Sequence, residues 1–275
     1  MPTITEPAKL KAATAYNAAS DHFDDEPLGF WKRYGERTVE RLALRPGTRV
    51  LDVGCGTGAS ALPAAARVGP TGTVIGIDLA DRLLEIARQK AASRNLGNAE
   101  FHFGDMERLS YPDGHFNAVI CVFAIFFVPD MAKQLRELWR MLGPDGQLAI
   151  TTWGPRVMEP AASVFWSAVK ELRPDLYLGF NPWDRITEPE PLRALLAEAD
   201  IANAEIAAED GRQGLRSPED WWTIVLGSGF RSIVDQMGPE MAGRLREANL
   251  AQIRSQSITS VETNVIYAVA RKTQM

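Results

Sequence analysis

Short apolar segments alternate with longer amphipathic segments between residues 49 and 153, and this alternation constrains the fold more than any other feature. The apolar runs predict strands at 49–53, 73–78, 100–103, 116–123 and 147–153. The amphipathic runs between them predict helices at 59–68, 81–96 and 131–142. Strands that alternate with helices at this spacing are typical of parallel sheets with crossover helices. We therefore expect an α/β protein with an open, doubly wound, mostly parallel sheet, whose ligands bind at the carboxyl ends of the strands.

The rest of the chain predicts helices before this core and a cap after it. Residues 1–45 contain two helical patterns, at 8–20 and 28–44, and residues 46–153 form the α/β core. Residues 188–210 and 261–275 supply the remaining strands of the core sheet. The intervening segments, 154–187 and 211–260, are mostly loop or helix, so we interpret them as insertions that form a helical cap over the strand ends.

A glycine-rich turn follows the first strand, where residues 50–58 read Val-Leu-Asp-Val-Gly-Cys-Gly-Thr-Gly. Glycines allow a sharp turn and a close approach of backbone to ligand, and the next helix presents free N–H groups there. The candidate ligand-binding residues of the turn are Gly54, Cys55, Gly56, Thr57 and Gly58. The same turn also fits the dinucleotide pattern Gly54-x-Gly56-x-x-Ala59, so an NAD(P)-dependent oxidoreductase is an alternative.

Acidic residues end three successive strands, and together they favour a cationic nucleoside over a dinucleotide. Asp78, followed by Leu79, is placed to accept hydrogen bonds from two ribose hydroxyls. Asp105, in Gly104-Asp105-Met106, suits an adenine amino group with Met106 against the ring. Asp52 would repel a pyrophosphate but attract an ammonium group, to which Cys121 could offer its backbone carbonyl. S-adenosylmethionine combines an ammonium, a sulfonium and a ribose without phosphate, and is the predicted cofactor.

Four segments of the chain resemble the successive motifs of class I S-adenosylmethionine-dependent methyltransferases, above all the ubiquinone/menaquinone-biosynthesis-like small-molecule branch. They are residues 50–58, 76–78, 104–106 and 140–148. The resemblance implies a Rossmann-like sheet of seven strands with an antiparallel last strand, and a contact from Tyr16 or its neighbours to the cofactor carboxylate. The chain departs from many relatives at residues 125–130, where they carry a pair of histidines, so the acceptor side is expected to be more apolar here.

The acceptor side is predicted to be an apolar pocket for aromatic compounds under the cap. Its candidate lining residues are Phe126, Phe127, Trp153, Trp183 and Trp222. The alternative is that these rings only join the cap to the core. His22 lies in the N-terminal segment that should cover the cleft, and is the candidate for proton transfer. The two cysteines and three histidines form no cluster that predicts a metal site.

Composition narrows the possible partners. The 275 residues include 30 Lys+Arg and 35 Asp+Glu, and a net charge of −5 argues against a nucleic-acid partner. The longest apolar run, 118–128, is shorter than the ~20 residues that span a bilayer. Two cysteines give no disulfide framework and residues 1–10 show no secretory signal, so we expect a cytoplasmic protein. The sequence thus predicts methyl transfer to a small metabolite, with an oxidoreductase or a non-catalytic nucleoside-binding protein as alternatives; it predicts no oligomeric state.

Overall fold

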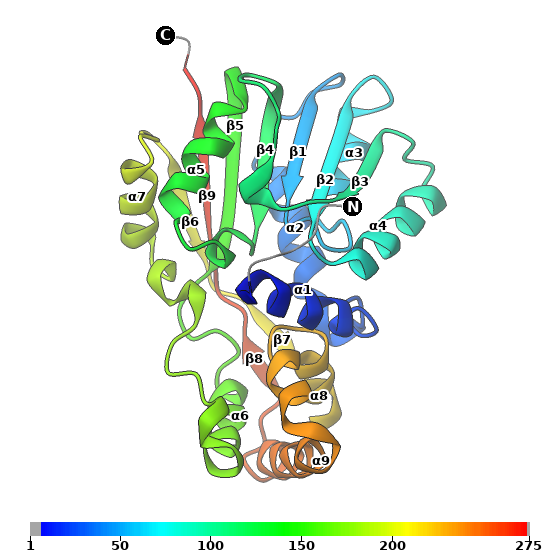
Figure 1. The fold of residues 1–275 in the computed structure, drawn as a ribbon, viewed down its shortest axis with the longest axis vertical. Coiled ribbons are helices and arrows are strands. Elements are labelled where there is room, and N and C mark those ends of the chain that lie inside the picture. Colours follow the sequence, from blue (N-terminus) through cyan, green and yellow to red (C-terminus); the bar gives the residue numbers. More distant parts are fainter. Residues whose placement is uncertain (1–6, 274–275) are drawn as a thin grey trace.

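A computed structural model describes residues 7–273; residues 1–6 and 274–275, which belong to the predicted first and last segments, lie outside the described residues. Seven strands form one sheet in the order β3-β2-β1-β4-β5-β9-β6 (Figure 1). They are β1 (Arg49–Val53), β2 (Thr73–Asp78), β3 (Ala99–Phe103), β4 (Phe116–Val122), β5 (Leu142–Trp153), β6 (Glu205–Glu209) and β9 (Val265–Arg271). β1 to β5 pair in parallel, whereas β9 runs antiparallel to β5 and β6. The predicted fold class is confirmed.

Each strand of the sheet's centre is buried on both faces, as its unbroken apolar run requires. In β1, Leu51 and Val53 pack into one hydrophobic cluster, and Val50 packs into another on the opposite face. Helices α2 (Phe30–Glu40), α3 (Ala61–Val68) and α4 (Asp81–Ser93) pack beside one another, and α5 (Met131–Arg140) packs beside α7 (Pro189–Glu198). Strand order reverses between β1 and β4, so ligand access is expected beside the loop that follows β1.

The cap consists of α6 (Ala161–Leu172), α8 (Pro218–Leu226) and α9 (Arg231–Ser255), at the opposite end of the molecule from the chain's C-terminus (Figure 1). Helix α1 (Pro7–Ala19) crosses between the sheet and the cap, and contacts both α4 and α9. A ribbon of β7 (Arg212–Gly214) and β8 (Ser260–Glu262), which the sequence did not predict, leads into and out of the helices α8 and α9. Short 3-10 helices occupy Glu26–Leu28, Met106–Arg108, Ile125–Phe127, Pro174–Leu176 and Pro182–Ile186.

Three predicted boundaries shift for local reasons. The predicted helix 28–44 ends at Glu40. The helical stretch predicted within 217–255 divides into α8 and α9, because residues 227–230 form a loop with two glycines. The last parallel strand begins at Leu142 instead of 147, since an irregularity in the β4–β5 pairing lets the Gly143–Gly146 turn join the sheet edge.

Candidate active site

A cavity of about 130 Å³ lies between the glycine turn, the ends of β2 and β3, and helix α1. Most of the residues predicted to bind the cofactor form its wall. They are Tyr16, Gly54, Cys55, Gly56, Thr57, Asp78, Leu79, Gly104, Asp105 and Met106. These residues come from four separate segments of the chain: helix α1 and the ends of β1, β2 and β3.

The glycine turn is held in its shape by its neighbours. Gly54 has φ +69°, and a Cβ added there would lie 2.3 Å from the Cβ of Ala124, so no other residue fits without movement. The Gly54 N–H donates to the Ile77 carbonyl at 2.8 Å, and the Gly56 N–H donates to Asp78 Oδ2 at 2.8 Å. The backbone of the turn is therefore tied to β2 at two points.

Asp78 joins the turn to the following loop, because its other oxygen, Oδ1, accepts from the Ala80 N–H at 2.9 Å. Burial raises the pKa of the Asp78 carboxyl, and backbone hydrogen bonds from Ala80, Gly56 and Leu79 oppose that shift. Each carboxylate oxygen has a second lone pair, so Asp78 can still accept from two ligand hydroxyls on the cavity side.

Asp105 is paired with a residue of α1 that the sequence analysis did not single out. Lys9 Nζ lies 2.7 Å from Asp105 Oδ2 and also contacts Glu107, while Asp105 Oδ1 accepts from the Glu107 N–H at 3.0 Å. Burial alone would lower the pKa of Lys9, but the hydrogen bonds and charges of the two acids outweigh it and raise that pKa. Lys9 thus fixes the start of α1 above the cavity.

Three residues predicted to bind the cofactor do not lie on the wall of either cavity. Asp52 is fully buried beneath the turn, where Oδ2 accepts from Ser60 Oγ at 2.6 Å, and burial raises its pKa to about 7. Gly58 faces the side chains of Leu62 and Phe101 instead of the cavity. Cys121 is buried in the middle of the sheet, opposite Val53. These three residues are therefore buried beside or beneath the turn and do not face the cavity.

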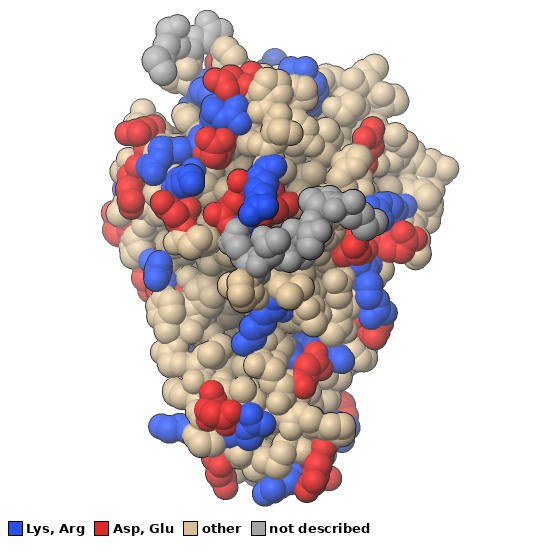
Figure 2. All heavy atoms as spheres, viewed as in Figure 1, with Lys and Arg blue, Asp and Glu red and all other residues tan. Residues whose placement is uncertain are grey.

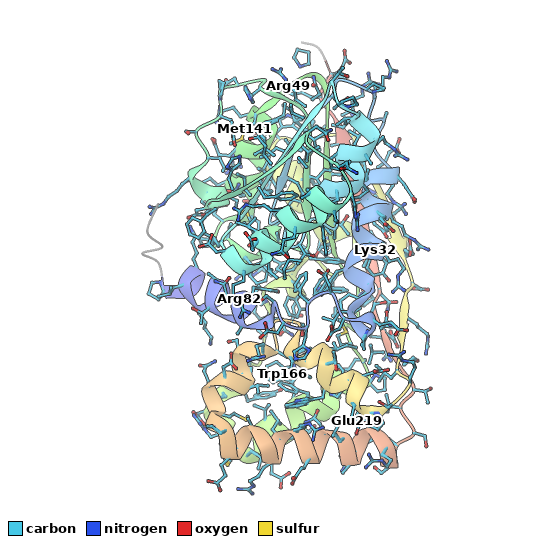
Figure 3. The ribbon with its side chains drawn as sticks, turned by 90° about the vertical axis from the view of Figure 1, so that its right-hand side faces the viewer. Lys32, Arg49, Arg82, Met141, Trp166 and Glu219 are labelled. Carbon is cyan, nitrogen blue, oxygen red and sulfur yellow. The ribbon has the colours of Figure 1, made fainter. Side chains whose placement is uncertain are left out.

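A second cavity, of about 560 Å³, lies between α1, the 3-10 helix 125–127 and the cap. Four of the predicted acceptor residues line it, namely Phe126, Phe127, Trp153 and Trp183, and so do Trp166 and Phe230 of the cap. Figure 3 shows Trp166 among the cap helices and Arg82 beside α1. Trp222 does not line this cavity, because it is buried within α8. We call the two spaces the turn cavity and the aromatic cavity.

His22, the predicted proton-transfer residue, lines neither cavity. Its Nδ1 lies 2.8 Å from Asp25 Oδ2, and its side chain is 35% exposed. The position therefore gives no support to a role for His22 in proton transfer.

The two cavities share a wall of aromatic rings, formed by Tyr16, Trp31, Phe123 and Phe127. Tyr16 meets Phe127 edge-on at 5.7 Å, and Phe123 stacks on Trp153 at 4.1 Å. Phe123 has φ +53°, a strained conformation for an aromatic residue of the kind found at functional sites. The sequence analysis missed Trp31 and Phe123, since neither belongs to a local motif. The two cavities therefore adjoin at these four rings.

Residues 7–273 show neither a metal site nor a membrane-spanning helix. Within that range, no group of His, Cys, Asp and Glu side chains could hold a metal ion. No helix in the same range is both long and apolar enough to cross a membrane.

Comparisons with known proteins identify the core. Residues 50–146 match the family described as methyltransferase domain. Nocamycin O-methyltransferase of Saccharothrix syringae is 36% identical over 129 residues, which cover 47% of this chain and 46% of that protein. Demethylmenaquinone methyltransferase of Listeria monocytogenes is 36% identical over 126 residues, covering 46% and 53%. Phosphoethanolamine N-methyltransferase 2 of Haemonchus contortus, solved with S-adenosylhomocysteine, is 17% identical with a TM-score of 0.59, over 100% of this chain and 62% of that one.

Residues 50–146 therefore match a methyltransferase domain, and this part of the chain is similar in sequence to demethylmenaquinone and ubiquinone/menaquinone methyltransferases. The chain spans about half the length of the curated relatives it matches. The turn cavity fits the cofactor of this class, because Gly54 leaves the backbone open to a ligand and Asp78 presents acceptors for hydroxyl groups. The matched residues exclude α1 and the cap, which supply part of the wall of the aromatic cavity.

Proposed function

We propose that this protein transfers a methyl group from S-adenosylmethionine to a small apolar or aromatic metabolite. The observation that carries the proposal is the shared wall: a cavity of about 560 Å³, lined by aromatic rings, meets the turn cavity at Tyr16, Trp31, Phe123 and Phe127. Two adjoining cavities of this kind are what a transfer between two bound molecules needs. A non-catalytic nucleoside-binding protein would not need the second cavity, and the family match does not favour an oxidoreductase.

In this proposal the turn cavity binds the nucleoside part of the cofactor. Asp78 accepts from the ribose, Asp105 and Met106 bind the adenine, and residues 54–57 pack against the remainder. The bound sulfonium supplies an activated methyl group, so the protein mainly has to align the acceptor and exclude water. Tyr16 belongs to this wall; burial and the nearby Asp78 raise its pKa, which keeps the hydroxyl protonated.

The acceptor in this proposal is itself nucleophilic, so that a protein base is not essential to the transfer. The described lining of the aromatic cavity contains no histidine or cysteine. The acids Glu159 and Asp184 accept hydrogen bonds from the Ser163 side chain and the Asn181 N–H. Arg156 is paired with Glu262. An acceptor that ionises easily, or one with an electron-rich carbon, meets this condition.

We also propose a cytoplasmic location and a small molecule as the partner. Both cysteines, Cys55 and Cys121, are buried free thiols, which suits a reducing compartment. Figure 2 shows positive and negative side chains interspersed on the visible face, without a continuous basic area of the kind that nucleic acids require.

The test is incubation with S-adenosylmethionine carrying a trideuteromethyl group and a library of small aromatic and polyketide-like compounds. Mass spectrometry should find a product that has gained the labelled methyl group. The control is the Gly54→Val variant, whose side chain would occupy the turn beside Ala124 and should abolish labelling. A library without any labelled product, tested with protein that binds the cofactor, would contradict methyl transfer to this class of compound.

A further inference from the structure

The hydroxyl of Tyr16 is the accessible polar side-chain group of the wall that the two cavities share. Of the other three residues of this wall, Phe123 and Phe127 are apolar, and Nε1 of Trp31 has almost no surface that a ligand could reach. Tyr16 is only partly buried. Its hydroxyl has no hydrogen-bond partner among residues 7–273, and unlike the Trp31 nitrogen it is not sealed by packing. The wall therefore offers this hydroxyl to a ligand.

The hydroxyl lies where the aromatic cavity approaches the turn cavity. A Cβ added to Gly229, in the loop between α8 and α9, would lie 3.7 Å from the Tyr16 oxygen. Gly229 lines the aromatic cavity and has no side chain to fill this space, so the hydroxyl borders the cavity there. Burial and the Asp78 carboxylate of the turn cavity both raise the pKa of Tyr16, so the hydroxyl is also within electrostatic range of that cavity.

Aromatic contacts hold the Tyr16 ring in this position before a ligand binds. The ring meets Phe127 edge-on with 5.7 Å between the ring centroids, and it meets Phe23 edge-on at 6.2 Å. A hydroxyl on a fixed ring loses little conformational freedom when it binds a ligand. Its hydrogen bond can therefore distinguish a ligand that carries a matching polar group from one that does not.

We propose that the Tyr16 hydroxyl binds the oxygen of the methyl acceptor, and that this acceptor is a phenol. This inference rests on the proposed function. A protonated tyrosine both donates and accepts a hydrogen bond, and the hydroxyl of a phenol does the same. Because its pKa is raised, Tyr16 stays protonated at neutral pH and can also donate to a phenolate. The ring of the phenol suits a cavity lined by Phe126 and Trp153.

Other partners fit this hydroxyl less well. A hydrocarbon forms no hydrogen bond with it, and an ammonium has no lone pair with which to attack the methyl group. A phenol loses its proton more readily than an aliphatic alcohol, which suits transfer without a protein base. The sequence resemblance predicts instead that Tyr16 contacts the cofactor carboxylate. The proximity of its hydroxyl to Gly229, which lines the aromatic cavity and not the turn cavity, favours the acceptor.

The test measures 1-naphthol against naphthalene by equilibrium dialysis, with S-adenosylhomocysteine at a saturating concentration. The quantity compared is the ratio of the two dissociation constants, in which their shared apolar contacts cancel. Tyr16→Phe keeps the ring and removes the hydroxyl alone. In this variant the preference for naphthol should fall about fivefold, the size expected for one neutral hydrogen bond. Its affinity for S-adenosylhomocysteine, measured by calorimetry, should stay unchanged.

Tyr177→Phe is the matched control, because it makes the same chemical change close to the same cavity. Tyr177 contacts Trp166 of the cavity wall, but it is 42% exposed and does not line the cavity itself. This variant should keep the wild-type preference for naphthol. An unchanged ratio in Tyr16→Phe would overturn the inference, and weaker S-adenosylhomocysteine binding with that unchanged ratio would assign the hydroxyl to the cofactor. Failure of the wild type to bind either compound would instead contradict the aromatic acceptor cavity, and with it the proposed function.

Discussion

At the scale of single residues, the shape of the turn cavity depends on two kinds of group. Some residues face the ligand, and others are buried beneath the glycine turn and fix its conformation. Asp52 is the clearest example, since it is fully buried, accepts from Ser60, and has one oxygen, Oδ1, without a partner among the described residues. A buried carboxyl of this kind favours its neutral form. The contribution of Asp52 to the free energy of folding therefore depends on pH.

The pH dependence of stability follows from the raised pKa of Asp52. Its value rises from 3.8 to about 7, so between these limits the folded state binds more protons than the unfolded state. Folding stability should then fall as pH rises towards 7, by up to about 1.4 kcal/mol per pH unit. Urea denaturation of the wild type and of Asp52→Asn at pH 5 and pH 8 measures this. The variant should lose less stability between the two; an equal loss in both proteins would show that Asp52 does not titrate in this range.

Gly54 offers a residue-level test of the turn. Gly54→Ala should destabilise the protein and abolish S-adenosylhomocysteine binding, because its Cβ would clash with Ala124 in addition to the ~1–2 kcal/mol cost of a left-handed alanine. Gly47→Ala is the control: it also has a positive φ, +84°, but its nearest neighbour is Thr71 Oγ1 at 3.9 Å, so it should show a backbone cost without a clash. Calorimetry and thermal unfolding of both variants check this. Equal effects of the two substitutions would mean that the contact with Ala124 is unimportant.

At the scale of elements, α1 is the part that closes the turn cavity. Its start is held by Lys9 on Asp105 and Glu107, and its end by Asn17, whose Oδ1 accepts from the Arg82 N–H at 2.9 Å. The helix therefore bridges the segment after β3 and the start of α4. We predict that cofactor exchange is faster when one of these attachments opens.

Removal of the Lys9 attachment should speed that exchange. In Lys9→Met, dissociation of S-adenosylhomocysteine should be roughly tenfold faster or more, since hydrogen bonds to charged groups contribute about 1.5–3 kcal/mol. Lys11→Met is the control, because Lys11 is exposed and makes no such pair with Asp105. Stopped-flow fluorescence measures both rates. If the rate for Lys9→Met equals that of the control, α1 does not close the cavity through this pair.

The sequence predicted those site residues that belong to a short, recognisable sequence pattern. The glycine turn, Asp78 and Asp105 each follow a recognisable strand, and the parallel sheet brings such strand ends together. Lys9 could not be predicted in this way, because its partner Asp105 lies about a hundred residues away in the chain.

The same limit applies to the aromatic residues. The tryptophans near the cap led to the prediction that they line a pocket. Trp222 does not, because it lies on the buried face of α8. Trp31 of α2, which was not predicted, lines the shared wall. Which ring faces a cavity depends on the packing of helices against one another, and no short pattern carries that information.

At the scale of the whole molecule, the sheet and the cap share one continuous hydrophobic cluster, which runs from Leu51 in β1 to Trp221 in α8. The matched methyltransferase residues, 50–146, supply most of the turn cavity, whereas α1 and the cap supply most of the aromatic cavity.

The identity of the ligand in the turn cavity tests the central claim most directly. Isothermal titration calorimetry of the wild type should show binding of S-adenosylhomocysteine and no detectable binding of NAD or NADP. Asp78→Ala should weaken that binding by about 1–3 kcal/mol, because ribose hydroxyls lose their acceptor, while Asp81→Ala, an exposed change three residues away, should not. Binding of NAD or NADP without binding of S-adenosylhomocysteine would contradict the account.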